Sequence, residues 1–138
     1  MKNLLKSKRG DGYIDVVVAV LVSMMLIVLS LNVFSFFTLK QDMDYYAKEM
    51  VAVACAEGGT ESIEVENRYY ELYDELGFYP SCTWSGEDYS TPTGRRVQLG
   101  EPIKLTMKYT TYVRGIGIIK IPVTLTVTHS GLSEKYWK

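Results

Sequence analysis

The chain has few of the residues on which most enzymes and metal proteins depend. Its 138 residues include one histidine and two cysteines. His129 has no cluster of Cys, Asp or Glu at metal-ligand spacing beside it. Ser130-Gly131 lacks the Gly-x-Ser-x-Gly frame of a nucleophilic serine. Gly115 and Gly117 lack the third glycine and the Lys-Ser/Thr of a phosphate-binding loop. We therefore expect no enzyme, no bound metal and no cofactor.

An excess of charge of either sign is also missing. The chain has 15 basic and 16 acidic side chains and a formal net charge of -1. Surfaces that bind nucleic acid are strongly basic, so the composition gives no support for a nucleic-acid partner. Once a leader and a membrane span are set aside, about 100 residues remain, which suffices for one small domain.

Charged residues are absent altogether from Val16 to Leu39. These 24 or so positions would extend roughly 36 Å as a helix, enough to cross a hydrocarbon core of about 30 Å. Apolar residues occupy every face of the run, which disfavours the core helix of a soluble protein. A secretory signal peptide has similar ingredients, but the run is about twice the usual length and Phe36 to Leu39 give no small-x-small cleavage pattern.

Basic residues precede the apolar run, whereas mixed charges follow it: Lys2, Lys6, Lys8 and Arg9 against Lys40, Asp42 and Asp44. This asymmetry predicts a single-pass protein of the cell membrane with a cytoplasmic N-terminus and an extracellular C-terminal domain.

The boundary sequence KSKRGDGYID resembles the processing site of type IV prepilins. In that family a dedicated peptidase cuts after a glycine that follows a basic leader, and the fifth mature residue is an acid that pairs with the amine of a neighbouring subunit. A cut after Gly10 makes Asp11 the N-terminus and Asp15 the fifth residue, whereas a cut after Gly12 makes Val17 the fifth. The sequence departs from the family pattern in two ways. The fifth residue is Asp where the family usually has Glu, and the first mature residue would be Asp where many pilins carry an apolar residue. The alternative is that Asp15 is only the last interfacial charge before a membrane anchor.

Helical periodicity continues beyond the apolar run. Met43, Ala47, Met50 and Ala54 recur at steps of three and four residues. We therefore expect one helix from Ile14 to Ala56, about 43 residues and on the order of 65 Å long, ended by Gly58-Gly59. A linker or a second short helix after the anchor is the alternative.

A second helix is predicted between Thr60 as its N-cap and Gly77 as its C-cap. One apolar stripe runs along this helix and consists of Val65, Tyr69, Leu72 and Leu76. The acidic residues of the helix are interpreted as a solvated face.

From Tyr79 the period changes to that of strands. We expect a short strand at Ser81–Ser85, a loop from Gly86 to Gly94, a strand or turn at Arg95–Leu99, and two alternating strands that start near Ile103 and Val123. Arg114-Gly115-Ile116-Gly117 would join the last two as a hairpin, and Pro122 predicts that its strand lies at an edge or begins with a bulge. The predicted fold class is α+β: a leader (1–10), a transmembrane helix (11–39), its exported continuation (40–57) and a small exported domain with one further helix and an antiparallel sheet (58–138).

Two further expectations concern the exported part. Cys55 and Cys82 lie where an oxidising compartment would join them, and closing a loop of about 27 residues would stabilise the fold by roughly 3–4 kcal/mol. The alternative is two free thiols.

Tyr136 and Trp137 near the C-terminus are expected to pack on their own domain, with lipid headgroups or a neighbouring subunit as alternatives.

With RGDGYID near its start and SEKYWK at its end, the whole chain resembles small pilin-like proteins related to the TadE-like minor pilins, found in secretion and conjugative systems of Gram-positive bacteria. The resemblance implies a minor pilin or pseudopilin that a prepilin peptidase cuts after Gly10. Its partners would be membrane lipid, other pilin subunits and, indirectly, a secretion platform protein and ATPase. It would assemble into a type IV-like pilus or secretion pseudopilus at the cell surface.

Two other readings stay open. The first is an unprocessed single-pass protein whose exported domain binds a partner in an envelope or conjugation complex. The second is an exported enzyme or ligand sensor, which would need a deep polar pocket.

Overall fold

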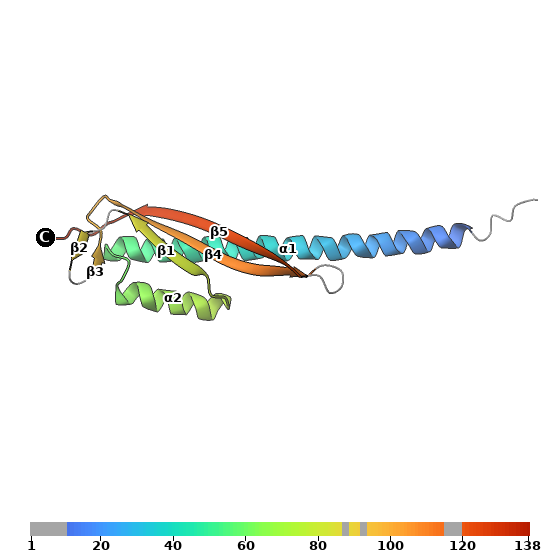
Figure 1. Ribbon diagram of the computed structural model, residues 1–138, viewed down its shortest axis with the longest axis horizontal. Helices are drawn as coiled ribbons and strands as arrows, with labels where there is room; N and C mark the ends of the chain where they lie inside the picture. The colour runs from blue at the N-terminus through green and yellow to red at the C-terminus, as the bar shows by residue number, and fades with distance from the viewer. Residues whose placement is uncertain (1–10, 87–88, 92–93, 115–119) are drawn as a thin grey trace, which may run out of the picture. The chain divides into compact units, whose positions relative to one another are not determined.

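The structure is a computed structural model that describes residues 11–86, 89–91, 94–114 and 120–138. The chain divides into two compact units, Met1–Phe36 and Phe37–Lys138. The elements in chain order are α1 (Asp11–Glu57), α2 (Ile63–Leu76), β1 (Ser81–Gly86), β2 (Tyr89–Thr91), β3 (Gly94–Arg96), β4 (Pro102–Arg114) and β5 (Lys120–Leu132) (Figure 1). The α+β class, with a long apolar N-terminal helix, a second helix and an antiparallel sheet, is therefore confirmed.

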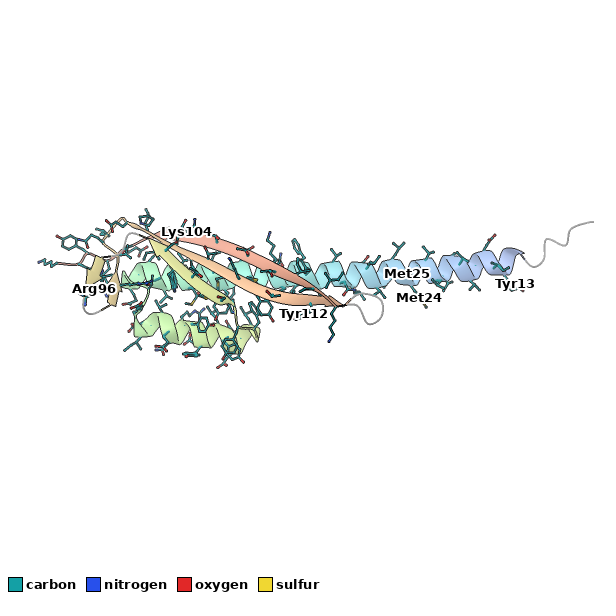
Figure 2. The ribbon with its side chains drawn as sticks, viewed as in Figure 1. Tyr13, Met24, Met25, Arg96, Lys104 and Tyr112 are labelled. Carbon is teal, nitrogen blue, oxygen red and sulfur yellow. The ribbon has the colours of Figure 1, made fainter. Side chains whose placement is uncertain are left out.

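The first unit, where it is described, consists of helix α1 alone. Every large apolar side chain from Tyr13 to Phe34 is exposed, from 43% for Val28 to 80% for Tyr13. Figure 2 shows Tyr13, Met24 and Met25 projecting from this part of the helix. In the described part of the chain, α1 is the one helix long and apolar enough to cross a membrane.

In the second unit, the later part of α1 supplies half of the core. Met43, Tyr46, Ala47, Met50 and Ala54 are at most 2% exposed, so the predicted stripe is buried as a whole. They pack against the inner face of the sheet and against α2, in a cluster that includes Ile103, Leu105, Met107, Val127, Val65 and Leu72. This burial holds the helices and the sheet together as one domain.

Helix α1 ends at Glu57, directly before the Gly58-Gly59 pair that was predicted to stop it. Gly58 adopts a φ of +62°, which favours glycine, and the N–H of Gly59 donates to Ala54 O at 3.1 Å. The predicted N-cap of α2 was wrong by two residues. Ser62, not Thr60, caps the helix, and its hydroxyl accepts from the Val65 N–H at 3.2 Å. Thr60 instead pairs its N–H with Arg95 O at 3.3 Å.

Helix α2 is joined to α1 by one ion-pair bridge and one hydrogen bond. Arg68 lies 3.0 Å from Glu49 of α1 and 2.9 Å from Glu71 of α2. The Tyr46 hydroxyl donates to Tyr69 O at 2.8 Å. The C-cap of α2 is Gly77 at a φ of +73°, which confirms that prediction.

The main sheet is antiparallel with the order β1-β4-β5. Strand β5 lies at an edge, as Pro122 predicted, and both long strands extend beyond the predicted alternation. Inward residues of β4 are buried, whereas hydroxyl pairs line its outer face: Thr106 with Thr128 at 3.3 Å and Thr110 with Thr124 at 2.9 Å. Gly115 and Gly117 of the predicted hairpin turn lie outside the described residues.

The segment predicted as a loop between Gly86 and Gly94 contributes strand β2, which pairs with β3 as a separate two-stranded ribbon. An isolated bridge joins Gly59 to Arg96, and Val97 N donates to Gly58 O at 2.9 Å. A methyl group at Gly59 would lie 2.9 Å from Arg95 O, so the absence of a side chain permits this approach. The ribbon therefore pairs with the chain directly after α1.

Candidate processing and assembly site

The candidate site lies at the N-terminal end of α1. Gly10 lies outside the described residues, and Asp11 is the first residue of the helix. Asp15 follows one turn later and is exposed, with no ion pair among the described residues. Asp15 lies in the first turns of the described helix, where the helix dipole favours negative charge.

Asp15 shares one face of α1 with small residues. At 100° per residue, Gly12, Asp15, Ala19, Ser23 and Ser30 fall within a sector of about 80°. Ser35 lies on the opposite face. Small side chains permit a neighbouring helix to approach closely. From Gly12 to Ser23 this sector holds only Asp15 and the small residues, so the carboxylate lies beside small side chains before Leu26 enters the same sector.

The polar side chains of this segment are satisfied within the helix. The hydroxyls of Ser23, Ser30 and Ser35 and the amide of Asn32 donate to the carbonyl four residues earlier, at 2.7 to 3.0 Å. Such bonds remove the need for water as a partner. The exposed surface of residues 16–36 is thus suited to lipid or to other apolar helices.

The predicted disulfide is not formed. Cys55 and Cys82 are both free thiols. Cys55 Sγ would lie 2.6 Å from a methyl group at Gly131 on β5, whereas Cys82 on β1 donates to Pro80 O at 3.7 Å. In the register of the sheet, Cys82 and Gly131 are two strands and four residues apart, roughly 16 Å. A disulfide requires Cα atoms within about 7 Å, so the fold keeps the two thiols apart.

Burial governs the chemistry of both thiols. It raises the pKa of Cys82 to about 11, and together with the nearby charge of Glu134 it raises the pKa of Cys55. Because the thiolate is the reactive form, both side chains are less reactive than an ordinary cysteine.

The C-terminal segment packs on its own domain, as predicted for Trp137. Its indole N–H donates to Gly58 O at 3.0 Å, and Arg96 and Lys135 lie over its ring at 4.2 and 4.8 Å. Tyr136 is 64% exposed. No local pattern indicated that Trp137 would pack against the end of α1.

Other polar groups in the second unit form no metal site. In the described part of the chain no group of three or more His, Cys, Asp or Glu side chains gathers as metal ligands would. His129 Nε2 lies 3.6 Å from Asp44 Oδ1, which ties β5 to α1. A groove of about 380 Å³ lies between α2 and β1 and is lined by Tyr69, Cys82, Trp84 and the buried Thr60. The Thr60 hydroxyl has no hydrogen-bond partner among the described residues.

Fold and site together define a small α+β domain joined to an apolar helix of membrane-spanning length. The chain belongs to the family described as a domain of unknown function (DUF4320), whose model matches residues 20–138. The match covers most of α1 and the whole second unit but not Gly10, Asp11 or Asp15. No curated protein and no solved structure matches the chain.

Proposed function

We propose that this protein is a minor pilin or pseudopilin. It is inserted by the apolar part of α1, cut after Gly10, and assembled from the membrane into a type IV-like pilus or secretion pseudopilus. One observation carries the proposal: α1 sets Asp15, which a cut after Gly10 would make the fifth residue, on the same face as Ala19 and Ser23, next to an exposed apolar surface.

Assembly in this account is mechanical rather than chemical. Helices pack through residues 16–37, with Ala19, Ser23 and Ser30 allowing close approach. The Asp15 carboxylate pairs with the new amino group at Asp11 of a neighbouring subunit. A charge in an apolar surrounding is costly when it is unpaired, so the pair fixes the axial register between subunits.

The processing step is tested by two glycine variants expressed in cells that carry their own prepilin peptidase. Gly10→Ala should leave the chain at full length and abolish its presence in sheared surface material. Gly12→Ala is the matched control, because a methyl group there has no neighbour within 4 Å. A Gly10→Ala chain that is processed as fully as the Gly12→Ala chain would contradict the cut after Gly10. A Gly12→Ala chain and a wild-type chain that both stay at full length would favour the unprocessed, partner-binding protein.

The assembly step is tested on two serines that make the same bond within α1. Ser23→Leu places a large side chain on the small-residue face, and Ser35→Leu places it on the opposite face. We expect Ser23→Leu to reduce filament yield severely and Ser35→Leu to have little effect, while both chains remain membrane-inserted and processed. An equal effect of the two substitutions would exclude this face as the packing surface.

A further inference from the structure

The outer face of the β4–β5 hairpin changes from polar to apolar near its far end. Outward residues are polar over most of its length: Lys104, Thr106, Lys108 and Thr110 on β4, and Thr124, Thr126, Thr128 and Ser130 on β5. The next cross-strand pair is Tyr112 with Pro122, and Tyr112 is 61% exposed. Figure 2 shows Tyr112 at the far end of the hairpin from Lys104.

The inner face is also apolar and uncovered at this end. Ile121 points to the same side as the buried Val127 but lies beyond the core and is 54% exposed. We call Tyr112, Lys120, Ile121 and Pro122 the hairpin end. A sheet segment with apolar residues on both faces suits an apolar medium better than water.

The position of the hairpin end along the axis of α1 follows from distances within the second unit. A methyl group at Gly131 would lie 2.6 Å from Cys55 Sγ and 3.0 Å from Val51 Cγ1, so Gly131 is level with Val51–Cys55. Ile121 lies ten residues back along β5, about 33 Å away. Leu39 lies about 14 residues back along α1, only about 21 Å away.

Strand β5 and the later part of α1 run in the same sense, so moving towards lower residue numbers leads the same way along both elements. The contact between His129 and Asp44 confirms this sense. Within the second unit the hairpin end therefore lies about 12 Å farther in this direction than Leu39. It is thus at the end of the domain at which the chain enters the apolar part of α1.

The charge of the hairpin suits a lipid surface. From Pro102 to Leu132 there is no Asp or Glu, whereas Lys104, Lys108, Arg114 and Lys120 are basic. Tyrosine is enriched at membrane interfaces, lysine keeps its ammonium group in the headgroup layer, and basic residues are attracted to anionic lipids.

We propose that the hairpin end inserts into the outer leaflet of the membrane in which α1 is anchored and contacts anionic phospholipid there. This rests on the membrane insertion and orientation of the proposed function. The contact gives the domain a second attachment to the membrane besides α1. It must be released when the subunit leaves the bilayer for a filament.

The test uses the full chain reconstituted in vesicles of phosphatidylcholine and phosphatidylglycerol, with an environment-sensitive fluorophore on one introduced cysteine. Ile121→Cys probes the hairpin end, Thr128→Cys on the same strand is the aqueous control, and Ser23→Cys reports insertion of α1. The native thiols label slowly near neutral pH because burial raises their pKa. The wild-type chain, treated identically, supplies the background.

We expect nitroxide-bearing lipids to quench the labels at Ile121→Cys and Ser23→Cys strongly and the label at Thr128→Cys hardly at all. Adding Lys120→Glu to Ile121→Cys should reduce the quenching, whereas adding Lys104→Glu should not. Quenching at Ser23→Cys alone would overturn the lipid contact but leave membrane insertion standing. No quenching at Ser23→Cys would overturn both. A blue-shifted but unquenched label at Ile121→Cys would assign the hairpin end to a protein partner instead and contradict the proposal.

Discussion

The indole N–H of Trp137 donates to the carbonyl oxygen of Gly58 at 3.0 Å, joining the end of the chain to the residue that terminates α1. The main chain of Trp137 is held in turn by Gln98, through bonds of 2.8 and 3.1 Å to the Gln98 side chain. The C-terminal segment thus fixes the end of the helix that carries the whole domain.

Loss of the Trp137 bond should destabilise the domain. We expect Trp137→Phe to lower the free energy of unfolding by about 1 kcal/mol, since the ring is kept and one hydrogen bond is lost. Trp137→Ala should cost about twice as much, because contacts with Arg96 and Lys135 are lost as well. Urea unfolding of the detergent-solubilised chain measures both. Tyr136→Ala, at an exposed site, is the control and should change stability by less than about 0.5 kcal/mol; a cost equal to that of Trp137→Ala would contradict this account.

Close packing of α1 on β5 predicts a specific double-mutant result. Gly131→Ala should lower stability by about 1–3 kcal/mol, because its methyl group would lie 2.6 Å from Cys55 Sγ. Cys55→Ala removes that sulfur, so the double variant should regain part of the loss. A full cycle of unfolding measurements gives the coupling energy. Strictly additive effects would show that the two residues do not meet.

The hydrogen bond between Tyr46 and Tyr69 predicts a difference between neighbouring tyrosines of α1. Tyr46 is fully buried and donates to Tyr69 O, so Tyr46→Phe should cost about 1 kcal/mol. Tyr45 is 42% exposed, and Tyr45→Phe should be nearly neutral. The denaturant midpoints of the two variants measure this difference. Equal shifts of the two midpoints would count against the hydrogen bond from Tyr46 to Tyr69 O.

Burial of Cys82 predicts a loss of stability at alkaline pH. Its pKa rises from 9.0 to about 11 on folding, so the folded state holds a proton that the unfolded state releases. This contribution is complete below about pH 9 and is lost as the pH rises through about 11. Burial also raises the pKa of Tyr46 and Tyr69, which adds a further loss of stability as the pH rises. Cys82→Ala should flatten the profile between pH 9 and 11, as followed by the denaturant midpoint; an unchanged profile would contradict burial of the thiol.

The sequence predicted those parts of the fold that depend on local periodicity. The stripe from Met43 to Ala54 and the stop at Gly58 were confirmed because helical spacing and glycine's freedom at positive φ act locally. Strands β4 and β5 were recognised because their inner and outer residues alternate. The cap of α2 was placed at Thr60 rather than Ser62 because both residues can cap, and only the pairing of Thr60 with Arg95 decides between them.

Features that depend on long-range pairing were not predicted. Strand β2 lies in the segment predicted as a loop, and β3 overlaps the strand or turn predicted at Arg95–Leu99. What was missed is that β3 is anchored by the backbone of Gly58 and Gly59. The disulfide was predicted from cellular compartment and loop length, which say nothing of register. That register sets Cys82 two strands away from Gly131, the residue beside Cys55. For the candidate site, the face shared by Asp15 and the small residues follows from the sequence once the helix is known to be unbroken, whereas the cut after Gly10 stays a prediction.

The most direct test of the central claim is the intact mass of the protein extracted from membranes of cells that carry their own prepilin peptidase, measured before and after reduction. The account predicts a chain that starts at Asp11, with the same mass in both measurements because both cysteines are free thiols. A chain that still starts at Met1 would contradict processing after Gly10 and with it the proposed pilin function. A mass lower by two hydrogens before reduction would contradict the separation of Cys55 from Cys82.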